Sequence, residues 1–197
     1  MVRNTEIELL KYIMLEPGIH VRELSRKLKL GIPSIKYGLE KLKKLKIVTT
    51  TIEGRNLKYF VNYNNELTTR YIYNVENHRL QEFPTKVRTA IYDYLKILET
   101  KPLMTIIFGS YARGDKNPKS DIDILLIFTD KIDKNIEDKT DIINSRYGII
   151  ISPIYMKWSE FNNKFHNNKD LFMKQVKEHK IIFQGLEWWL MLENENA

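Results

Sequence analysis

The sequence predicts an α+β protein with two domains, residues 1–78 and 79–197. Three observations support this prediction. Three short segments with helical spacing of apolar residues precede two strand-like runs in the first domain. A polar, Asn-rich stretch over 62–79 then marks the boundary. Beyond it, strand-like apolar runs alternate with segments of helical spacing, so a small sheet flanked by helices is expected.

Composition narrows the class of protein. The chain has 197 residues, 43% of them hydrophobic, which indicates a globular protein large enough for one or two cores. It has no Cys, which excludes disulfides and thiolate metal sites, and its four His residues show no ligand spacing. The N-terminus lacks the apolar region of a secretory signal, and no apolar run approaches the ~20 residues of a membrane span. We therefore expect a cytoplasmic protein with no membrane partner.

Charge is distributed unevenly along the chain. The net charge is +7, and residues 1–80 carry all of it, with 15 Lys and Arg against 8 Asp and Glu. Residues 81–197 carry 17 of each sign. Such asymmetry indicates that the N-terminal part faces nucleic acid.

The first domain is predicted to hold three helices and a hairpin. Helices are expected over Glu6–Leu15, over His20–Leu28 and from Ser34 onward, the last with Ile35, Leu39, Leu42 and Leu45 facing inward. Residues 47–52 and 57–61 are rich in β-branched and aromatic residues and form a hairpin with a basic tip.

This order of elements resembles a winged helix-turn-helix domain. The resemblance implies that the third helix enters the major groove of double-stranded DNA while the wing touches the flanking backbone. The DNA contacts it implies are Ser34, Lys36, Tyr37 and Lys41 on the third helix, and Arg55 and Lys58 on or near the wing. Two alternatives stay open: the Lys-rich helix is a solvated face, or the domain serves dimerisation.

The second domain carries the most informative motif. One apolar run ends in Gly109-Ser110, and ten residues later Asp121-Ile122-Asp123 opens another. Side chains alternate along a strand, so Asp121 and Asp123 point the same way. Two adjacent carboxylates repel each other, and a cation between them removes the repulsion. Oxygen ligands of this kind suit Mg²⁺ bound together with substrate phosphates. Gly109 permits close approach of a ligand, and Ser110 offers a hydroxyl and a backbone N–H.

The pattern Gly-Ser-x10-Asp-x-Asp resembles the signature of the DNA polymerase beta-type nucleotidyltransferase superfamily, in its minimal branch, over roughly the last 115 residues. It implies an α/β domain with a small mixed sheet, in which Asp121 and Asp123 are catalytic and hold Mg²⁺. Gly109 and Ser110 would grip the phosphates of an NTP. Arg113 would neutralise phosphate charge or is a surface residue. The alternative for Asp121 and Asp123 is that they are only turn residues at the start of a strand.

One feature departs from the family pattern. Active members carry a third carboxylate on the following strand, predicted here over Gly148–Tyr155, and that strand has no Asp or Glu. Ser152 takes the missing position, and Asp141 and Glu160 flank the strand at places that the sequence does not determine. A hydroxyl neither balances metal charge nor takes a proton at neutral pH, so robust catalysis is not expected.

Two functions therefore stay open. The first, which we favour from sequence, is a DNA-binding transcriptional regulator whose nucleotidyltransferase-like domain binds Mg²⁺-nucleotide or mediates a homodimer. The alternative is an active enzyme that moves NMP from NTP to a hydroxyl on a protein or small molecule. Some small members of the family are antitoxins that modify a partner toxin, so a toxin is a further expected partner. The apolar segment 186–192, with Trp188 and Trp189, is expected to be the last packed helix; an oligomer interface is the alternative.

Overall fold

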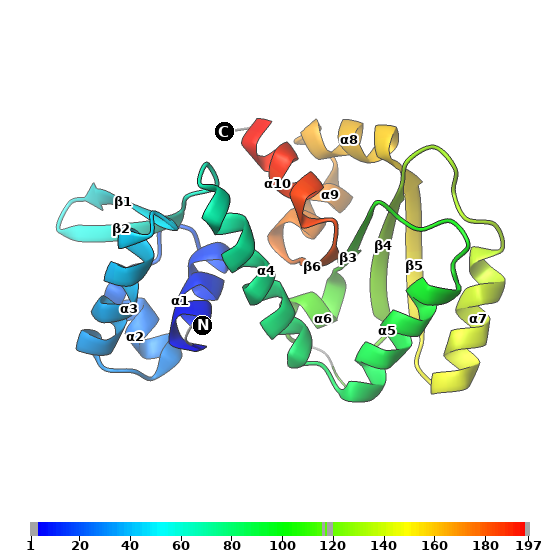
Figure 1. Ribbon diagram of the computed structural model, residues 1–197, viewed down its shortest axis with the longest axis horizontal. Helices are drawn as coiled ribbons and strands as arrows, with labels where there is room; N and C mark the ends of the chain where they lie inside the picture. The colour runs from blue at the N-terminus through cyan, green and yellow to red at the C-terminus, as the bar shows by residue number, and fades with distance from the viewer. Residues whose placement is uncertain (1–3, 116, 118–119, 196–197) are drawn as a thin grey trace. The chain divides into compact units, whose positions relative to one another are not determined.

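The computed structural model describes residues 4–115, 117 and 120–195. The chain forms two compact units, Met1–His78 and Arg79–Ala197 (Figure 1). Among the described residues, every helix is too short or too polar to cross a membrane.

The first unit contains three helices, a hairpin and most of a fourth helix. Its elements are α1 (Asn4–Leu15), α2 (Val21–Leu28), α3 (Ile32–Lys44), β1 (Val48–Glu53), β2 (Asn56–Val61) and the larger part of α4 (Glu66–Gln81). The two strands are antiparallel, with Val48 opposite Val61 and Glu53 opposite Asn56. Apolar residues from all of these elements form one buried core, which includes Leu9, Leu10, Ile13, Leu24, Ile35, Leu39, Leu42, Tyr59 and Val75.

Local sequence explains where α2 and α3 begin. His20 caps α2: its Nδ1 accepts from the Glu23 N–H at 3.3 Å, and the Glu23 carboxylate accepts from the His20 N–H at 3.4 Å. Helix α3 begins at Ile32, earlier than the expected Ser34, because Pro33 is accommodated in the first turn of a helix.

Leu45 was expected in the core, and that prediction is wrong. Leu45 is 40% exposed because α3 ends at Lys44, and Leu45 caps the helix instead of continuing its inward face. The following Asn-rich stretch is also more ordered than its composition indicates. Asn65 donates its side-chain amide to the Leu45 carbonyl at 2.8 Å, and Asn62 donates to the Lys46 carbonyl at 2.8 Å. These amides satisfy carbonyls at the end of α3, and α4 follows at Glu66.

The second unit is a four-stranded mixed sheet with helices, as predicted. Its further elements are α5 (Thr85–Ile97), β3 (Met104–Ile107), α6 (Gly109–Arg113), β4 (Ile122–Phe128), α7 (Ile136–Tyr147), β5 (Ile151–Lys157), α8 (Trp158–His166), α9 (Leu171–Glu178), β6 (Ile181–Gln184) and α10 (Leu186–Glu195). The strand order is β5-β4-β3-β6; β4 and β5 are parallel and the other pairs antiparallel (Figure 1). Helix α5 begins at Thr85, directly after Pro84.

Helices cover the sheet on both faces. Ile122, Ile124 and Leu126 of β4 belong to the same buried cluster as apolar residues of α5 and α7. The side chains between them, from Asp123 onward, point to the opposite face. Helix α8 contacts β4 and β5, and its Phe165 packs edge-on against Trp189 of α10 with ring centroids 5.0 Å apart. Trp189 is buried, so α10 is a packed helix as expected, while Trp188 stays 39% exposed beside Trp158.

Candidate active site

The chain turns sharply between β3 and α6, and this turn carries the Gly-Ser pair. Phe108 precedes α6 in an extended conformation, and its N–H donates to the Asp123 carbonyl at 3.1 Å. Gly109 then adopts a φ of +65°, in the left-handed region that favours glycine. Helix α6 has five residues and ends at Gly114, which has a φ of +81°. The turn therefore holds Ser110 beside the first residues of β4.

Gly109 lies directly against the carboxylate of Asp123. A Cβ on residue 109 would lie 2.0 Å from Asp123 Oδ2 and 2.9 Å from its Cγ, so no larger residue fits without displacing the carboxylate. Asp121 is exposed just before β4, and Asp123 is half-buried within it. The structure thus brings together Gly109, Asp121 and Asp123, with Ser110 half-buried next in the chain.

The electrostatics of this cluster favour a bound cation. Burial raises the pKa of Asp123 above its ordinary value, and the negative charge of Asp121 raises it further. Arg113 acts in the opposite direction and lowers the pKa of Asp123. The contribution of Asp121 to the raised pKa of Asp123 reflects repulsion between two ionised carboxylates. A divalent cation with oxygen ligands would offset that repulsion, so the donor set fits one Mg²⁺.

Arg113 is close enough to interact with Asp123 but is engaged elsewhere. Its Nε donates to Asp115 Oδ2 at 3.0 Å, and both residues are exposed. Of the two sequence-based alternatives for Arg113, the structure supports a charged residue at the edge of the site. Whether it contacts phosphate stays a prediction.

Packed aromatic rings fix α6 from both sides. Tyr111 is buried and meets Phe83 edge-on, with ring centroids 5.1 Å apart. Phe108 meets Phe172 of α9 edge-on at 5.6 Å. These contacts hold the Gly-Ser turn in place and set α9 beside it.

Arg79 is a site-supporting residue that sequence reasoning missed. It is 5% exposed, and its guanidinium donates to the Ala112 carbonyl of α6 at 3.2 Å and to the Lys180 carbonyl before β6 at 2.6 Å. A buried guanidinium is uncommon. Arg79 lies at the end of a polar Asn-rich stretch, so the sequence did not predict that it is buried. Both of its partners are backbone atoms far along the chain.

The strand after the motif places Ser152 beside Asp123. In the parallel pairing of β4 and β5, Asp123 lies opposite Ser152, and both side chains point to the same face. Strand β5 itself, Ile151–Lys157, has no carboxylate. The two flanking candidates, Asp141 on α7 and Glu160 on α8, are both exposed.

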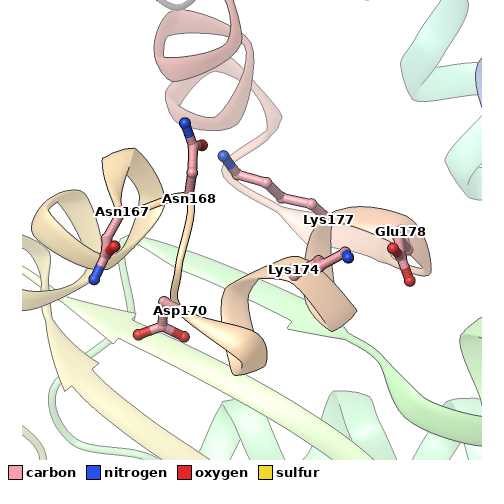
Figure 2. Close-up of a pocket in the computed structure, with 6 residues that line it drawn as sticks. All are labelled: Asn167, Asn168, Asp170, Lys174, Lys177 and Glu178. Carbon is pink, nitrogen blue, oxygen red and sulfur yellow. The ribbon is translucent and has the colours of Figure 1, made fainter.

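A polar pocket of about 370 Å³ lies along α9. Its lining comes from the loop after α8 and from α9: Asn167, Asn168, Asp170, Lys174, Lys177 and Glu178. Figure 2 shows the side chains of Asn168 and Lys177 pointing toward one another across it. Lys177 is held in place, since its Nζ donates to the Phe165 carbonyl at 2.7 Å. None of the residues predicted from sequence belongs to this lining.

The residues predicted to contact DNA lie in the first unit. Ser34, Lys36 and Tyr37 are exposed on α3, and Arg55 is exposed at the hairpin tip. The other two already have partners: Lys41 Nζ pairs with Glu6 at 3.0 Å, and Lys58 pairs with Glu53. All six stay predicted DNA contacts, and four of them are fully exposed.

Comparison with known proteins identifies the second unit. The family model described as "Nucleotidyltransferase domain" matches residues 91–195. Two proteins of Methanocaldococcus jannaschii are similar to the chain. One, named "Putative protein adenylyltransferase MJ0604", is 42% identical over 87 residues, which are 40% of this chain and 86% of the relative. The other, "Putative protein adenylyltransferase MJ1305", is 31% identical over 120 residues, which are 57% of this chain and 75% of the relative.

A solved structure is weakly similar. "Crystal structure of the toxin-antitoxin with AMP-PNP" has 18% identity and a TM-score of 0.42, and it covers 57% of this chain and 83% of its own. The family match begins at residue 91, so it leaves the first unit outside. The family model matches more than half of the chain, and the first relative is 42% identical to it. The chain therefore belongs to the nucleotidyltransferase domain family.

Proposed function

We propose that the second unit transfers a nucleotidyl group from an NTP to a hydroxyl on a protein. The observation that carries this proposal is the close packing of Asp123 against Gly109, with Asp121 beside them. That arrangement sets two carboxylates next to a turn that carries the half-buried Ser110. The names of the two relatives support adenylyl as the group and a protein as the acceptor. They favour the enzyme over the regulator that the sequence alone suggested.

Each residue of the cluster has a proposed role. Asp121 and Asp123 would hold Mg²⁺, which when bound would neutralise charge on the phosphates. Gly109 lets the turn pack against the Asp123 carboxylate, the backbone N–H and hydroxyl of Ser110 would bind the phosphate tail, and Arg113 would add positive charge at its edge. Arg79 would position α6 through the Ala112 carbonyl.

The reaction forms one bond and breaks one. The oxygen of the acceptor hydroxyl bonds to the α-phosphorus of the NTP while the bond between that phosphorus and the bridging oxygen breaks, and pyrophosphate leaves. The hydroxyl proton goes to water, because the side chain next to Asp123 on β5 is the Ser152 hydroxyl and not a carboxylate. A rate well below that of enzymes with a general base is expected.

Labelled nucleotide tests the proposal directly. Purified full-length protein is incubated with Mg²⁺ and a lysate of the source cells, with ATP carrying ³²P at the α or the γ position. Transfer to a protein band from α-labelled ATP alone, absent in Asp121→Asn/Asp123→Asn, is the expected result. Label from the γ position that also depends on Asp121 and Asp123, or equal labelling from α-labelled ATP by the double variant, would exclude nucleotidyl transfer at this site.

For the first unit we propose a second function, binding of double-stranded DNA by a winged helix-turn-helix domain. Exposure of Ser34, Lys36 and Tyr37 on α3 and of Arg55 on the hairpin supports it, together with the +7 charge of residues 1–80. Lys and Arg contacts to phosphates make such binding depend steeply on salt.

The DNA proposal is tested by fluorescence anisotropy with a labelled duplex at several salt concentrations. Lys36→Glu/Arg55→Glu should weaken binding and flatten its salt dependence, while Lys131→Glu, an exposed change in the second unit, should not. Equal affinity for wild type and the double variant would remove this face as the DNA site. A toxin as acceptor and a homodimer stay predictions of the family resemblance.

A further inference from the structure

The register of β4 and β5 decides which side chain can share a cation with Asp123. Residues opposite each other in neighbouring strands are adjacent on one face, and here they are Asp123 and Ser152. Both are half-buried, so a ligand at Asp123 would also lie next to the Ser152 hydroxyl. Ser152 thus occupies the place from which a third metal ligand would come.

Neither flanking carboxylate can replace it. Asp141 belongs to α7, whose Ile143 packs in the buried cluster with Ile122 and Ile124, on the face of β4 opposite to Asp123. Glu160 belongs to α8, which begins beyond Lys157, the residue opposite Phe128. Phe128 lies five positions after Asp123, and this spacing is a distance of about 16 Å along a strand. Both carboxylates therefore lie away from the cluster.

The spacing of ligand atoms among the described residues leads to the same conclusion. No set of three Asp, Glu, His or Cys side chains that includes Asp121 or Asp123 has its ligand atoms all within 4.8 Å of one another in the part of the chain that the structure describes. Asp115, the nearest further carboxylate along the motif, is paired with Arg113 at 3.0 Å. The site therefore offers two carboxylates.

Charge then limits how many cations these ligands hold. Two metal ions about 3.5–4 Å apart repel each other, and carboxylates that bridge or flank both ions offset the repulsion. The two carboxylates together with the nucleotide phosphates can hold one divalent cation. A second cation, away from the phosphates, would depend on a further charged protein ligand beside Asp123. The Ser152 hydroxyl is neutral and adds no charge.

We infer that this site binds one divalent cation together with the nucleotide, and that Ser152 is the residue that prevents a second. The inference rests on the proposed nucleotide site and states its metal stoichiometry. It predicts that a carboxylate at position 152 creates the second cation position.

Counting bound Mn²⁺ by electron paramagnetic resonance tests the inference without measuring catalysis. The full chain is saturated with α,β-methylene-ATP and titrated with Mn²⁺, and the loss of the free-ion signal gives the number bound. We expect one Mn²⁺ per nucleotide complex in the wild type and two spin-coupled ions in Ser152→Asp. The matched control Ser152→Asn has the same shape without the charge and should bind one.

The outcomes separate the inference from the function on which it rests. Two coupled Mn²⁺ ions in the wild-type complex would overturn the inference and leave nucleotide binding intact. A single ion in folded Ser152→Asp would overturn the assignment to position 152. Absence of nucleotide binding by the wild type would instead overturn the proposed function. The wild-type count tests the stoichiometry even if Ser152→Asp fails to fold.

Discussion

The α-carbon of Gly109 and the carboxylate of Asp123 are in such close contact that a Cβ on residue 109 would lie 2.0 Å from Oδ2. The contact joins the end of β3 to the start of β4, two antiparallel neighbours in the sheet. The turn is proposed to receive phosphate, and the carboxylate is proposed to hold metal. The contact joins the two into one rigid unit. Changes at either residue should therefore affect both.

Gly109→Ala should abolish Mg²⁺-nucleotide binding, because the new methyl group displaces the Asp123 carboxylate. Calorimetric titration of ATP with Mg²⁺ measures this effect. Gly114→Ala is the matched control: Gly114 also has a positive φ, but a Cβ there meets no atom of the described residues within 4 Å. Both variants should lose about 1 kcal/mol of stability from backbone strain, and only Gly109→Ala should lose binding. Equal binding by the two variants would contradict the proposed role of the contact.

Asp123→Asn should stabilise the metal-free protein at neutral pH by roughly 1 kcal/mol, as expected where a functional charge is held at a cost to folding. Burial and Asp121 raise the pKa of Asp123 in the folded state. A raised carboxyl pKa means that the folded state binds the proton more tightly. Ionisation therefore destabilises it as pH rises from the unfolded pKa through the folded one.

Urea unfolding of wild type and Asp123→Asn between pH 3 and 8 measures this difference. The two curves should converge at the acidic end, where Asp123 is protonated in both states. Added Mg²⁺ with ATP should reverse the order at neutral pH, since only the wild type gains from binding. The expectation would be contradicted if, without ligand at neutral pH, the wild type were more stable than Asp123→Asn.

Arg79→Met should weaken nucleotide binding although residue 79 lies outside the motif. The change removes donors to the Ala112 and Lys180 carbonyls, so the C-terminal end of α6 loses its anchor. Leaving the buried Ala112 carbonyl and the part-buried Lys180 carbonyl without these donors also costs about 2 kcal/mol of stability. Titration at a temperature where the variant is fully folded separates the two effects. Arg79→Lys, which keeps one ammonium donor, should recover part of the affinity, and Lys86→Met, an exposed change, should not alter it.

Lys139→Met should destabilise the second unit by about 3 kcal/mol, because it leaves the Asp133 carboxylate buried without its cation. Burial alone would raise the pKa of Asp133, but hydrogen bonds from Lys139 Nζ at 2.5 Å and the Thr100 N–H at 2.6 Å outweigh it and lower the pKa. Stabilisation from a lowered carboxyl pKa is complete above the unfolded pKa and is lost as pH falls through the folded one.

Thermal unfolding between pH 2 and 7 checks the prediction for this pair. The wild type should lose stability below the ordinary Asp pKa of about 3.9, and Asp133→Asn should lose less over the same range. Lys131→Met, an exposed change nearby, should stay within about 0.5 kcal/mol of the wild type. A loss as large in this control would show that the effect is not specific to the buried pair.

Much of the second unit could be predicted from short-range pattern. The apolar runs that became β3 and β4 are bounded by Gly109 and Asp121, and the helices on either side follow the spacing of residues such as Ile91 and Leu95. Errors concentrate at the ends of elements. Helix α3 begins two residues earlier than expected, since Pro33 fits the first turn of a helix.

By itself, the sequence determined the family and the Gly-Ser and Asp-x-Asp pairs of the site, because both pairs depend on spacing along single strands and one turn. Only the tertiary structure decided which residues meet them. The neighbour of Asp123 on β5 depends on strand register, and the hydrogen bonds of Arg79 to Ala112 and Lys180 depend on packing across 33 and 101 residues of chain. Such long-range contacts leave no periodic trace in the sequence, since each is made by one side chain at one place.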